Sequence, residues 1–160
     1  MSRSNPRVLS TLERAGGFAS AQEIYENPRT TKVAQITNDP AMNLFEGEIV
    51  DIHLVLSPTI RLELPPHLAA LPRGRYTFGI RASGITLDSA GFPFQIELAE
   101  ISGSETFLHL QHEQVHVVGL LDSVQNFDIG QTVTAGIDSS SLYAFDQSGN
   151  LVASPYGGTK

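Results

Sequence analysis

The hydrophobic pattern of the chain changes its period near residue 40. Before that point the pattern is helical: Ser20 opens a Ser-x-x-Glu capping box, and Pro28 limits the first helix. We therefore expect one short helix over residues 21–26 and a second over residues 29–37. After residue 40, apolar and polar residues alternate, which is typical of half-buried strands.

This alternation predicts a series of short strands. The first covers residues 48–56 and would place Val50, Ile52, Leu54 and Leu56 on one face. Clusters of Gly, Pro, Asn, Asp and Ser separate it from those that follow. The later strands are expected at residues 61–64, 76–81, 92–100, 106–110, 114–120, 132–137, 142–145 and 151–153. Many short strands divided by turns predict a closed or nearly closed small barrel.

Length and composition narrow the class of protein. A chain of 160 residues should form one compact unit, or two small subdomains that share a core. No apolar run approaches the roughly 20 residues that span a bilayer, and no apolar stretch follows the N-terminal arginines as in a secretory signal. The absence of cysteine excludes disulfides, thiolate metal sites and cysteine nucleophiles. We expect a soluble intracellular protein.

The net charge of −7 is unevenly distributed. Up to Arg81 there are nine basic and eight acidic residues, whereas from Ala82 onward there are nine acidic residues and one base, the terminal Lys160. Nucleic-acid binding depends on Lys and Arg that meet phosphates. We therefore expect no nucleic-acid partner. We also expect any symmetric interface to use apolar edges and to leave the carboxylates at its rim.

One local cluster of histidines has two interpretations. If His112 and Glu113 form a two-residue turn, His109 faces His116 across the strands, close enough for two imidazoles to share a zinc ion. Alternatively, these are polar side chains on the wet face of an antiparallel pair. The proposed turn contains no Gly or Asn for positive φ, which favours the second interpretation.

Catalytic motifs give no support for an enzyme. The chain has no Gly-x-Ser-x-Gly elbow, and the carboxylate pairs fit solvated strand positions. It also has no Gly-x-x-x-x-Gly-Lys-Ser/Thr loop, whose backbone N–H groups, lysine and hydroxyl hold nucleotide phosphates and magnesium. We expect this chain to hydrolyse no ATP and to hold no cofactor of its own.

Six short patterns nevertheless occur together in a fixed order. They are Glu23-Ile24-Tyr25-Glu26-Asn27-Pro28, Val33-Ala34, Pro40-Ala41-Met42-Asn43, Gly79-Ile80-Arg81, Gly103-Ser104-Glu105-Thr106, and Phe145-Asp146 with Gly149. Over residues 20–152 the chain resembles the C-terminal regulatory region (the TOBE, OB-fold part) of ATP-binding subunits of ABC importers. The type resembled is the maltose, sn-glycerol-3-phosphate or oligosaccharide class. One departure is that Ala82-Ser83-Gly84 follows Arg81, where that family usually continues Pro-Glu-His.

The resemblance and the period of two together imply a mostly β protein. We expect a small OB-like barrel with an additional strand-rich subdomain and two short helices at the N-terminus. The implied organisation is a tail or poorly ordered lead-in (1–19), a helical lead-in (20–39), an OB-like regulatory region (40–153) and a C-terminal tail (154–160). The positions that match the family signature, with structural roles, are Tyr25, Pro28, Met42, Asn43, Gly79, Arg81, Gly103, Ser104 and Glu105.

Three of these positions have expected roles of their own. Tyr25 on its one-turn helix would be a packing anchor, Met42 would plug the end of the barrel, and Asn43 would close a turn by bonding nearby backbone.

For function, the resemblance implies a regulatory and dimerisation module of an importer for sugars or glycerol phosphate. The intact family member uses ATP and magnesium, acts at the cytoplasmic face of the plasma membrane with permease subunits, and in some cases contacts a cytosolic regulator. The alternative is a small-ligand sensor for an oxyanion or sugar metabolite. Its candidate ligand residues are the arginines Arg61, Arg73, Arg75 and Arg81.

Overall fold

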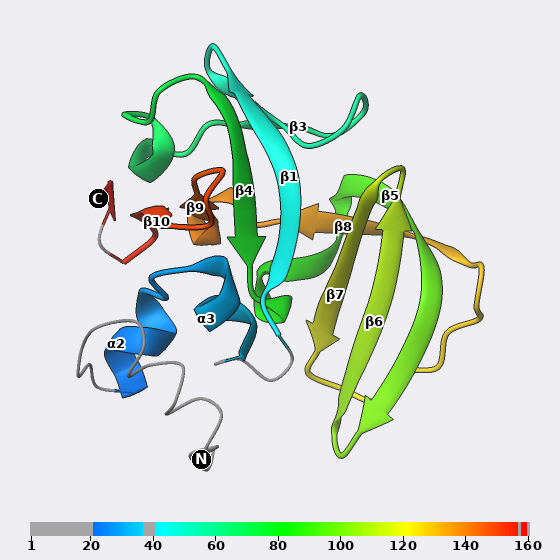
Figure 1. The fold of residues 1–160 in the computed structure, drawn as a ribbon. Coiled ribbons are helices and arrows are strands. Elements are labelled where there is room, and N and C mark those ends of the chain that lie inside the picture. The colour runs from blue at the N-terminus through cyan, green and yellow to red at the C-terminus, as the bar shows by residue number, and fades with distance from the viewer. Residues whose placement is uncertain (1–20, 37–40, 157, 160) are drawn as a thin grey trace.

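The computed structural model describes residues 21–36, 41–156 and 158–159, and Figure 1 shows their arrangement. The predicted lead-in over residues 1–19 and the capping residue Ser20 lie outside the described residues. Helix α2 (Ala21–Glu26) has the predicted bounds, and helix α3 (Thr31–Ile36) lies within the second predicted helix. Helix α3 begins after Thr30, because the Thr30 hydroxyl oxygen accepts a hydrogen bond of 3.1 Å from the backbone N–H of Val33.

Seven strands form the larger sheet, in the order β11-β10-β9-β4-β1-β2-β3, with every neighbouring pair antiparallel. Short 3₁₀ turns adjoin two of them: η1 (Pro66–Leu68) precedes β4, η2 (Ala82–Gly84) follows β4, and η3 (Ser139–Ser141) precedes β9. The strands are β1 (Asn43–Val50), β2 (His53–Val55), β3 (Arg61–Glu63), β4 (Gly74–Ile80), β9 (Tyr143–Phe145), β10 (Leu151–Ser154) and β11 (Gly158–Thr159). Strand pairing thus extends into residues 154–160, where the sequence predicted a tail.

The smaller sheet has the order β7-β6-β5-β8. Strand β5 is long because it continues through an irregularity, at which Leu87 and Phe92 both pair with Ala135. A Cβ atom on Gly91 would lie 2.2 Å from the carbonyl oxygen of Ala135, so only glycine fits at this bulge. The strands are β5 (Ile85–Ser102), β6 (Glu105–His112), β7 (Val115–Leu121) and β8 (Thr132–Ile137).

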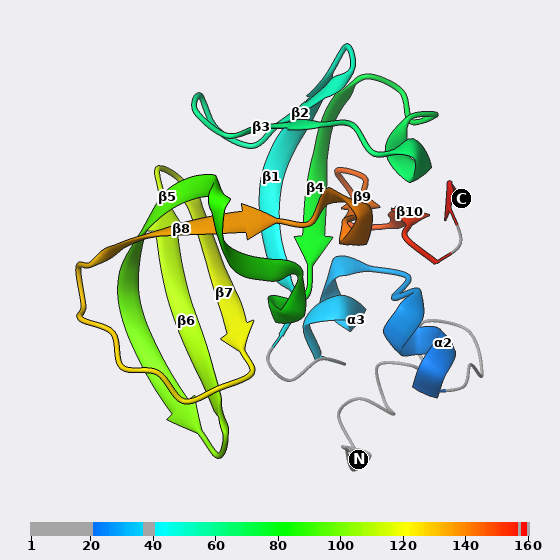
Figure 2. The same cartoon turned by 180° about the vertical axis from the view of Figure 1, so that it is seen from behind.

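The predicted fold class is confirmed: the protein is mostly β, with two helices, a curled half-barrel sheet and a second sheet. Buried apolar residues of both sheets form one continuous core, to which Ile49 and Phe78 contribute from the larger sheet and Phe94 and Leu108 from the smaller. Seen from behind in Figure 2, the two helices lie beside the ends of β1 and β4, away from the β2–β3 hairpin. Neither described helix is long and apolar enough to cross a membrane.

The predicted strand over residues 48–56 is wrong, because the chain turns back within it. Strand β1 ends at Val50, which pairs with His53 at the start of β2. Asp51 occupies the turn with φ +54°, a left-handed conformation that Asp tolerates better than most side chains. Ile52 at the turn is 69% exposed and Val50 is 40% exposed, so these two residues do not share the buried face of Leu54.

The predicted turn between β6 and β7 is displaced by one residue. His112 pairs with Val115, so the turn consists of Glu113 and Gln114, and Glu113 carries the positive φ of +53°. The side-chain N–H of Gln114 then donates to the carbonyl of Leu56 over 3.3 Å. The hairpin tip of the smaller sheet is therefore tied to the loop after β2.

A polar network completes this contact between the sheets. The carboxylate of Glu113 accepts hydrogen bonds from the hydroxyls of Ser57 (2.9 Å) and Thr59. The imidazole of His112 lies between the Thr59 hydroxyl and the carbonyl of Pro93. We call Ser57, Thr59, His112 and Glu113 the tip network.

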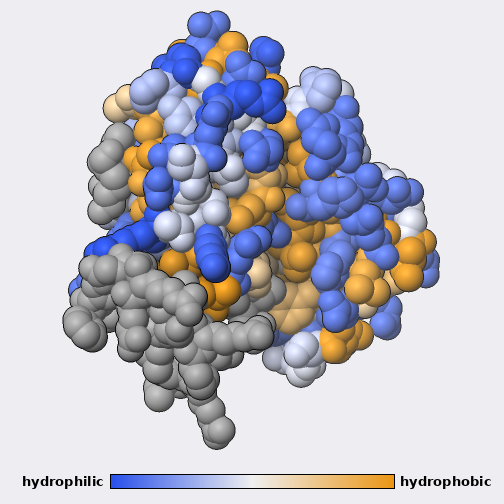
Figure 3. Space-filling model, viewed as in Figure 1, coloured by the Kyte–Doolittle hydropathy of each residue, from blue (hydrophilic) through white to orange (hydrophobic). Residues whose placement is uncertain are grey.

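The outer face of the smaller sheet carries both apolar and polar side chains. Leu98, His109 and Val118 lie in one cross-strand row, and Leu98 is 42% exposed. In Figure 3, hydrophobic residues are visible over this sheet beside hydrophilic ones. The opposite face is closed by residues such as Leu108 and Val117, which are almost completely buried.

Candidate functional site

Five of the six sequence patterns meet where the described part of the helical lead-in, residues 21–36, packs on the larger sheet. The loop between α2 and α3 bonds to the turn between β9 and β10: the N–H of Thr31 donates to Gly149 (2.9 Å) and the N–H of Leu151 donates to Arg29 (2.7 Å). Thr30 and Asn150 form a β-bridge between these hydrogen bonds. We call this region, where the lead-in meets the core, the junction.

The pattern Phe145-Asp146 with Gly149 forms the turn that receives the lead-in. The Asp146 carboxylate accepts hydrogen bonds of 2.9 Å from the backbone N–H groups of both Ser148 and Asn150. Gly149 has φ +87°, a conformation that L side chains rarely adopt. The turn is therefore held in the shape that presents the Gly149 carbonyl to Thr31.

A small apolar cluster lies beneath the lead-in. Ala34, Met42, Tyr143 and Phe145 are buried there, separately from the main core. A Cβ atom on Gly79 would lie 2.6 Å from the sulfur of Met42, so the glycine provides the space that Met42 fills. Met42 therefore packs between α3 and β4, as part of the floor on which the lead-in rests.

Asn43 has a different role from the predicted one. Its side chain bonds twice to the backbone of Val118 in β7: Nδ2 donates to the carbonyl (2.9 Å), and Oδ1 accepts from the N–H (2.7 Å). β7 is an edge strand, so the Asn43 amide satisfies backbone groups that would otherwise lack a strand partner. The prediction that Asn43 closes a local turn is wrong, because the residue joins the two sheets.

Arg81 follows β4, and its side chain extends between two tyrosines. The centre of the guanidinium lies 3.7 Å from the ring centroid of Tyr25 and 5.0 Å from that of Tyr143. The guanidinium also donates a hydrogen bond to the Tyr143 hydroxyl. Arg81 thus connects helix α2, through Tyr25, to the buried Tyr143 of β9, a cation–π arrangement that arginine favours.

Tyr143, beneath Arg81, is a neutral phenol. Removal from water raises the pKa of its hydroxyl, and the hydrogen bond and charge of Arg81 oppose that rise. A tyrosine is already neutral near pH 7, and the raised pKa extends the neutral form to higher pH. Its oxygen accepts from Arg81 while the ring packs against Met42 and Phe145.

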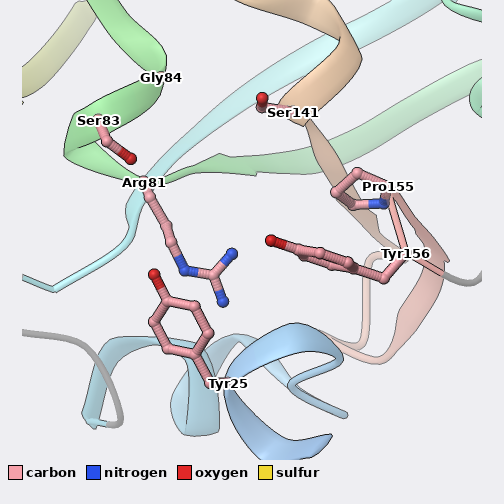
Figure 4. A pocket seen from close by; sticks show the side chains of 7 residues that line it. All are labelled: Tyr25, Arg81, Ser83, Gly84, Ser141, Pro155 and Tyr156. Atoms are coloured by element: carbon pink, nitrogen blue, oxygen red, sulfur yellow. The ribbon is translucent and has the colours of Figure 1, made fainter. Parts of the chain in front are cut away.

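A cavity of about 310 Å³ opens beside Arg81. Four separate parts of the chain surround it: helix α2, the connection from β4 to β5, η3, and the segment after β10. Figure 4 shows the Arg81 guanidinium and the Tyr156 phenol pointing into the same space. The lining residues are Tyr25, Arg81, Ser83, Gly84, Ser141, Pro155 and Tyr156.

The other three candidate arginines lie elsewhere. Arg73 donates hydrogen bonds to the carbonyls of Ala69 (3.1 Å) and Leu71 (2.8 Å), which gives it a structural role in the η1 loop. Arg61 and Arg75 are exposed on β3 and β4. Of the four, only Arg81 lines the cavity between α2 and the core.

The predicted pairing of His109 with His116 is also wrong. The displaced turn places His109 opposite Val118 and His116 opposite Gln111. Each imidazole instead contacts a carboxylate on β5: His109 lies 2.6 Å from Glu100, and His116 lies 3.1 Å from Glu97. Within the part of the chain that the structure describes, no three His, Asp or Glu side chains are grouped so as to hold a metal ion.

The sixth pattern lies apart from the junction. Gly103 and Ser104 form the two-residue turn between β5 and β6, with Ser102 opposite Glu105. Gly103 has φ +62°, as the first position of a type II′ turn requires. This pattern shapes a hairpin.

Sequence reasoning missed several residues of the site. Tyr143 was expected only as part of a strand, and Ser83, Ser141 and Tyr156 were assigned no role. Ser83 follows Arg81 by two residues, whereas Ser141, Tyr143 and Tyr156 lie far from it in the sequence and approach it in a fold where β9 pairs with β4. A signal was available in the departure after Arg81, where Ser83 and Gly84 replace bulkier family residues and line the cavity.

Comparison with known proteins agrees with the residue patterns. The chain is 28% identical over 140 residues to the sn-glycerol-3-phosphate import ATP-binding protein UgpC of Brucella abortus, covering 82% of this chain and 37% of that protein. It is 29% identical to UgpC of Pectobacterium atrosepticum, covering 84% and 39%. It is 25% identical to the multiple sugar-binding transport ATP-binding protein MsmK of Streptococcus mutans, covering 91% and 42%. No family model matches the chain.

These homologues are ATP-binding subunits of ABC importers, so the resemblance predicted from the sequence is confirmed. The chain spans about two fifths of the length of each relative.

Proposed function

We propose that this chain is the regulatory and dimerisation module of an ABC importer ATP-binding subunit that serves sugar or glycerol-phosphate uptake. The proposal starts from its homologues UgpC and MsmK, which are ATP-binding subunits of ABC importers. The similarity to them covers more than four fifths of this chain. In this proposal the chain hydrolyses no ATP itself. ATP and magnesium bind to a nucleotide-binding domain of the family type, which in turn contacts the membrane permease subunits at the cytoplasmic face.

The observation that supports this proposal most strongly is the convergence at the junction. Residues from five separate patterns hold the lead-in against the core through backbone pairing, close packing at Gly79, and the stacking of Tyr25 on Arg81. A rigid attachment of this kind is what a regulatory domain needs in order to transmit its position to the domain that precedes it. Such coupling requires an element with defined contacts, because a flexible linker passes on no orientation.

Self-association is the second part of the proposal. A symmetric dimer that brought the acidic residues after Ala82 face to face would place like charges together. The interface should therefore be apolar, with carboxylates at its rim, and salt should leave the dimer intact or tighten it. Sedimentation at low and moderate salt measures this. A dimer that dissociates steeply as salt rises would contradict the charge argument, and a strict monomer at high concentration would remove self-association from this chain.

Transport chimeras test the regulatory role. The chain replaces the matching region of a UgpC protein, and both ATP hydrolysis and uptake of glycerol phosphate are measured in the assembled importer. We expect a chimera that assembles and transports, and a Tyr25→Ala chimera that assembles but shows altered coupling of hydrolysis to uptake. The matched control is Tyr25→Phe, which retains the ring on Arg81. If the chimeras with Tyr, Ala and Phe at position 25 showed the same ATP hydrolysis and the same uptake, the proposed role of the junction would be contradicted.

A further inference from the structure

We propose that the cavity beside Arg81 binds a small hydroxylated oxyanion, meaning a phosphate or carboxylate compound that also carries hydroxyl groups. Bound there, the ligand would fasten helix α2 to the β core. The regulatory effect of fastening α2 rests on the proposed function above. Binding of the anion depends only on the cavity.

The charge of the lining points to an anion. Arg81 is the only charged residue among the seven that surround the cavity, and none of the seven is acidic, although the whole chain carries a net charge of −7. Ser141, one of the lining residues, donates its hydroxyl to the carboxylate of Asp138 (2.8 Å), which also accepts from the hydroxyl of Ser140 (2.6 Å). These hydrogen bonds direct Asp138 toward η3, so the arginine determines the sign of the charge in the cavity.

The neutral lining groups point to a ligand with hydroxyls. Tyr25, Ser83 and Tyr156 each bring a hydroxyl group to the cavity, and no hydrogen bond involving these three hydroxyls is formed within the described part of the chain. Each hydroxyl can both donate and accept. A hydroxylated oxyanion would use both functions, with its charged group toward Arg81 and its hydroxyls toward Tyr156 and Ser83.

The size of the cavity fits a small organic molecule. Its volume of about 310 Å³ corresponds to roughly ten water molecules at about 30 Å³ each. A three-carbon phosphate occupies part of this space and leaves room for hydration or for a larger sugar phosphate.

The position of the cavity gives the ligand a mechanical effect. Tyr25 belongs to the lead-in, whereas Ser83, Ser141 and Tyr156 belong to the core. Because Tyr25 is 44% exposed, its attachment depends on few contacts, and a ligand that touches both sides would add to them. Ligand binding would therefore shift the lead-in toward its docked position.

The test uses the 160-residue chain and two probes, glycerol 2-phosphate and glycerate, with glycerol as the neutral control at matched ionic strength. Amide chemical shifts are recorded during each titration. We expect saturable shifts at Ser83, Gly84, Ser141 and Tyr156 with the anions and none with glycerol. The absence of saturation at concentrations on the order of 10 mM would overturn the proposal.

Variants distinguish a built site from general attraction of anions. Tyr156→Phe removes one hydroxyl from an exposed ring and should weaken binding about two- to tenfold, since one hydrogen bond to the ligand is lost. Arg81→Lys should weaken anion binding more, because the planar guanidinium with its paired N–H donors is lost. Its amide spectrum is first compared with that of the wild type to show that the variant is folded. The matched control is Arg75→Gln, an exposed arginine outside the cavity, which should leave binding unchanged. Equal weakening by Arg75→Gln and Tyr156→Phe would show nonspecific attraction and overturn the proposal.

Two further measurements complete the test. Hydrogen exchange should slow in residues 21–26 when the anion binds, and binding without that protection would overturn the fastening of α2.

Vesicles of phosphatidylglycerol present the same phosphate and hydroxyl chemistry on a membrane. We expect the protein not to cosediment with these vesicles. If the wild type cosediments with them and Arg81→Lys does not, the choice of a small soluble ligand would be overturned. None of these measurements requires an ATPase or a dimer, so their failure is distinguishable from failure of the proposed function.

Discussion

The junction and the tip network both join distant parts of the chain, but they do so with opposite chemistry. At the junction the contacts are buried packing, backbone pairing and one arginine between two tyrosines. At the tip, the hydroxyls of buried Ser57 and exposed Thr59 and the imidazole of His112 surround a single carboxylate, Glu113. The junction should therefore be strong and insensitive to pH, whereas the tip should be weak and titratable.

The two regions also differ in how far the sequence reveals them. The junction is assembled from residues of recurring patterns, such as Tyr25, Met42 and Gly79. The tip corresponds to no pattern, and its turn was predicted one residue away from its position. The resemblance therefore carries information about the docking of the lead-in and none about the contact between the sheet ends.

The largest expected effect is that of overpacking at the junction. Gly79→Val would place new atoms against Met42, Leu44 and Phe145, which lie 2.6, 3.2 and 3.2 Å from an added Cβ atom. We expect a loss of about 3 kcal/mol in the free energy of unfolding, measured by urea denaturation. The control Thr77→Val on the same strand should change it by less than about 0.5 kcal/mol. Equal effects of the two substitutions would show that Met42 adjusts freely.

The next effect compares two side-chain amides that each join the two sheets, Asn43 beside the junction and Gln114 at the tip. Asn43→Ala removes two hydrogen bonds and leaves the N–H and carbonyl of Val118 without this partner, so we expect a loss of about 2 kcal/mol. Gln114→Ala at the tip removes a single hydrogen bond of 3.3 Å and should cost well under about 1 kcal/mol. If Gln114→Ala cost as much as Asn43→Ala in urea denaturation, the proposed contrast between the regions would be wrong.

A smaller effect is expected for the aromatic contact of the lead-in. Tyr25→Ala removes the ring that lies on Arg81, and for a partly exposed cation–π contact we expect a loss of about 1 kcal/mol. Tyr25→Phe keeps the ring and should be nearly neutral. Thermal denaturation of both variants measures the difference. A Phe variant as unstable as the Ala variant would assign the effect to the hydroxyl.

The smallest effect is the pH dependence of the tip. Hydrogen bonds from Thr59 and then Ser57 lower the pKa of Glu113 below its ordinary value. Since the folded pKa is below the unfolded one, this contribution to stability is present above the unfolded pKa and is lost as pH falls through the folded pKa. Thr59→Val should therefore be less stable than the wild type at pH 7, and the difference should shrink below roughly pH 4. Urea denaturation at both pH values measures it, and a difference that grows in acid would contradict the assignment.

Much of the fold could be predicted from the sequence, because period-two alternation depends only on which residues face the core. Helix α2 and strand β8 have their predicted bounds. Two failures lie at turns made by residues other than glycine. Asp51 and Glu113 adopt positive φ although neither is the glycine that such turns favour, so the hairpin at Asp51 was missed and the one at Glu113 was displaced by one residue. Strand β5 also begins before the predicted strand over residues 92–100, because it continues through the bulge at Gly91.

The site was less predictable, because its contacts depend on strand order. Arg81 and Tyr143 meet only when β4 pairs with β9, and Asn43 reaches Val118 only when the two sheets face each other. Local sequence carries no information about such long-range register. The resemblance identified Tyr25, Asn43 and Arg81 as signature positions, and the structure is required to show what each one touches.

Hydrogen exchange over residues 21–36 tests most directly whether the signature residues hold the lead-in to the core. Exchange is compared between the wild type and Tyr25→Ala, with the amides of β4 and β6 as internal references. We predict that Tyr25→Ala accelerates exchange in α2 and leaves the references unchanged, since local opening of the lead-in needs less free energy than global unfolding. Unchanged exchange in α2, or equal acceleration in α2, β4 and β6, would contradict this account of the junction.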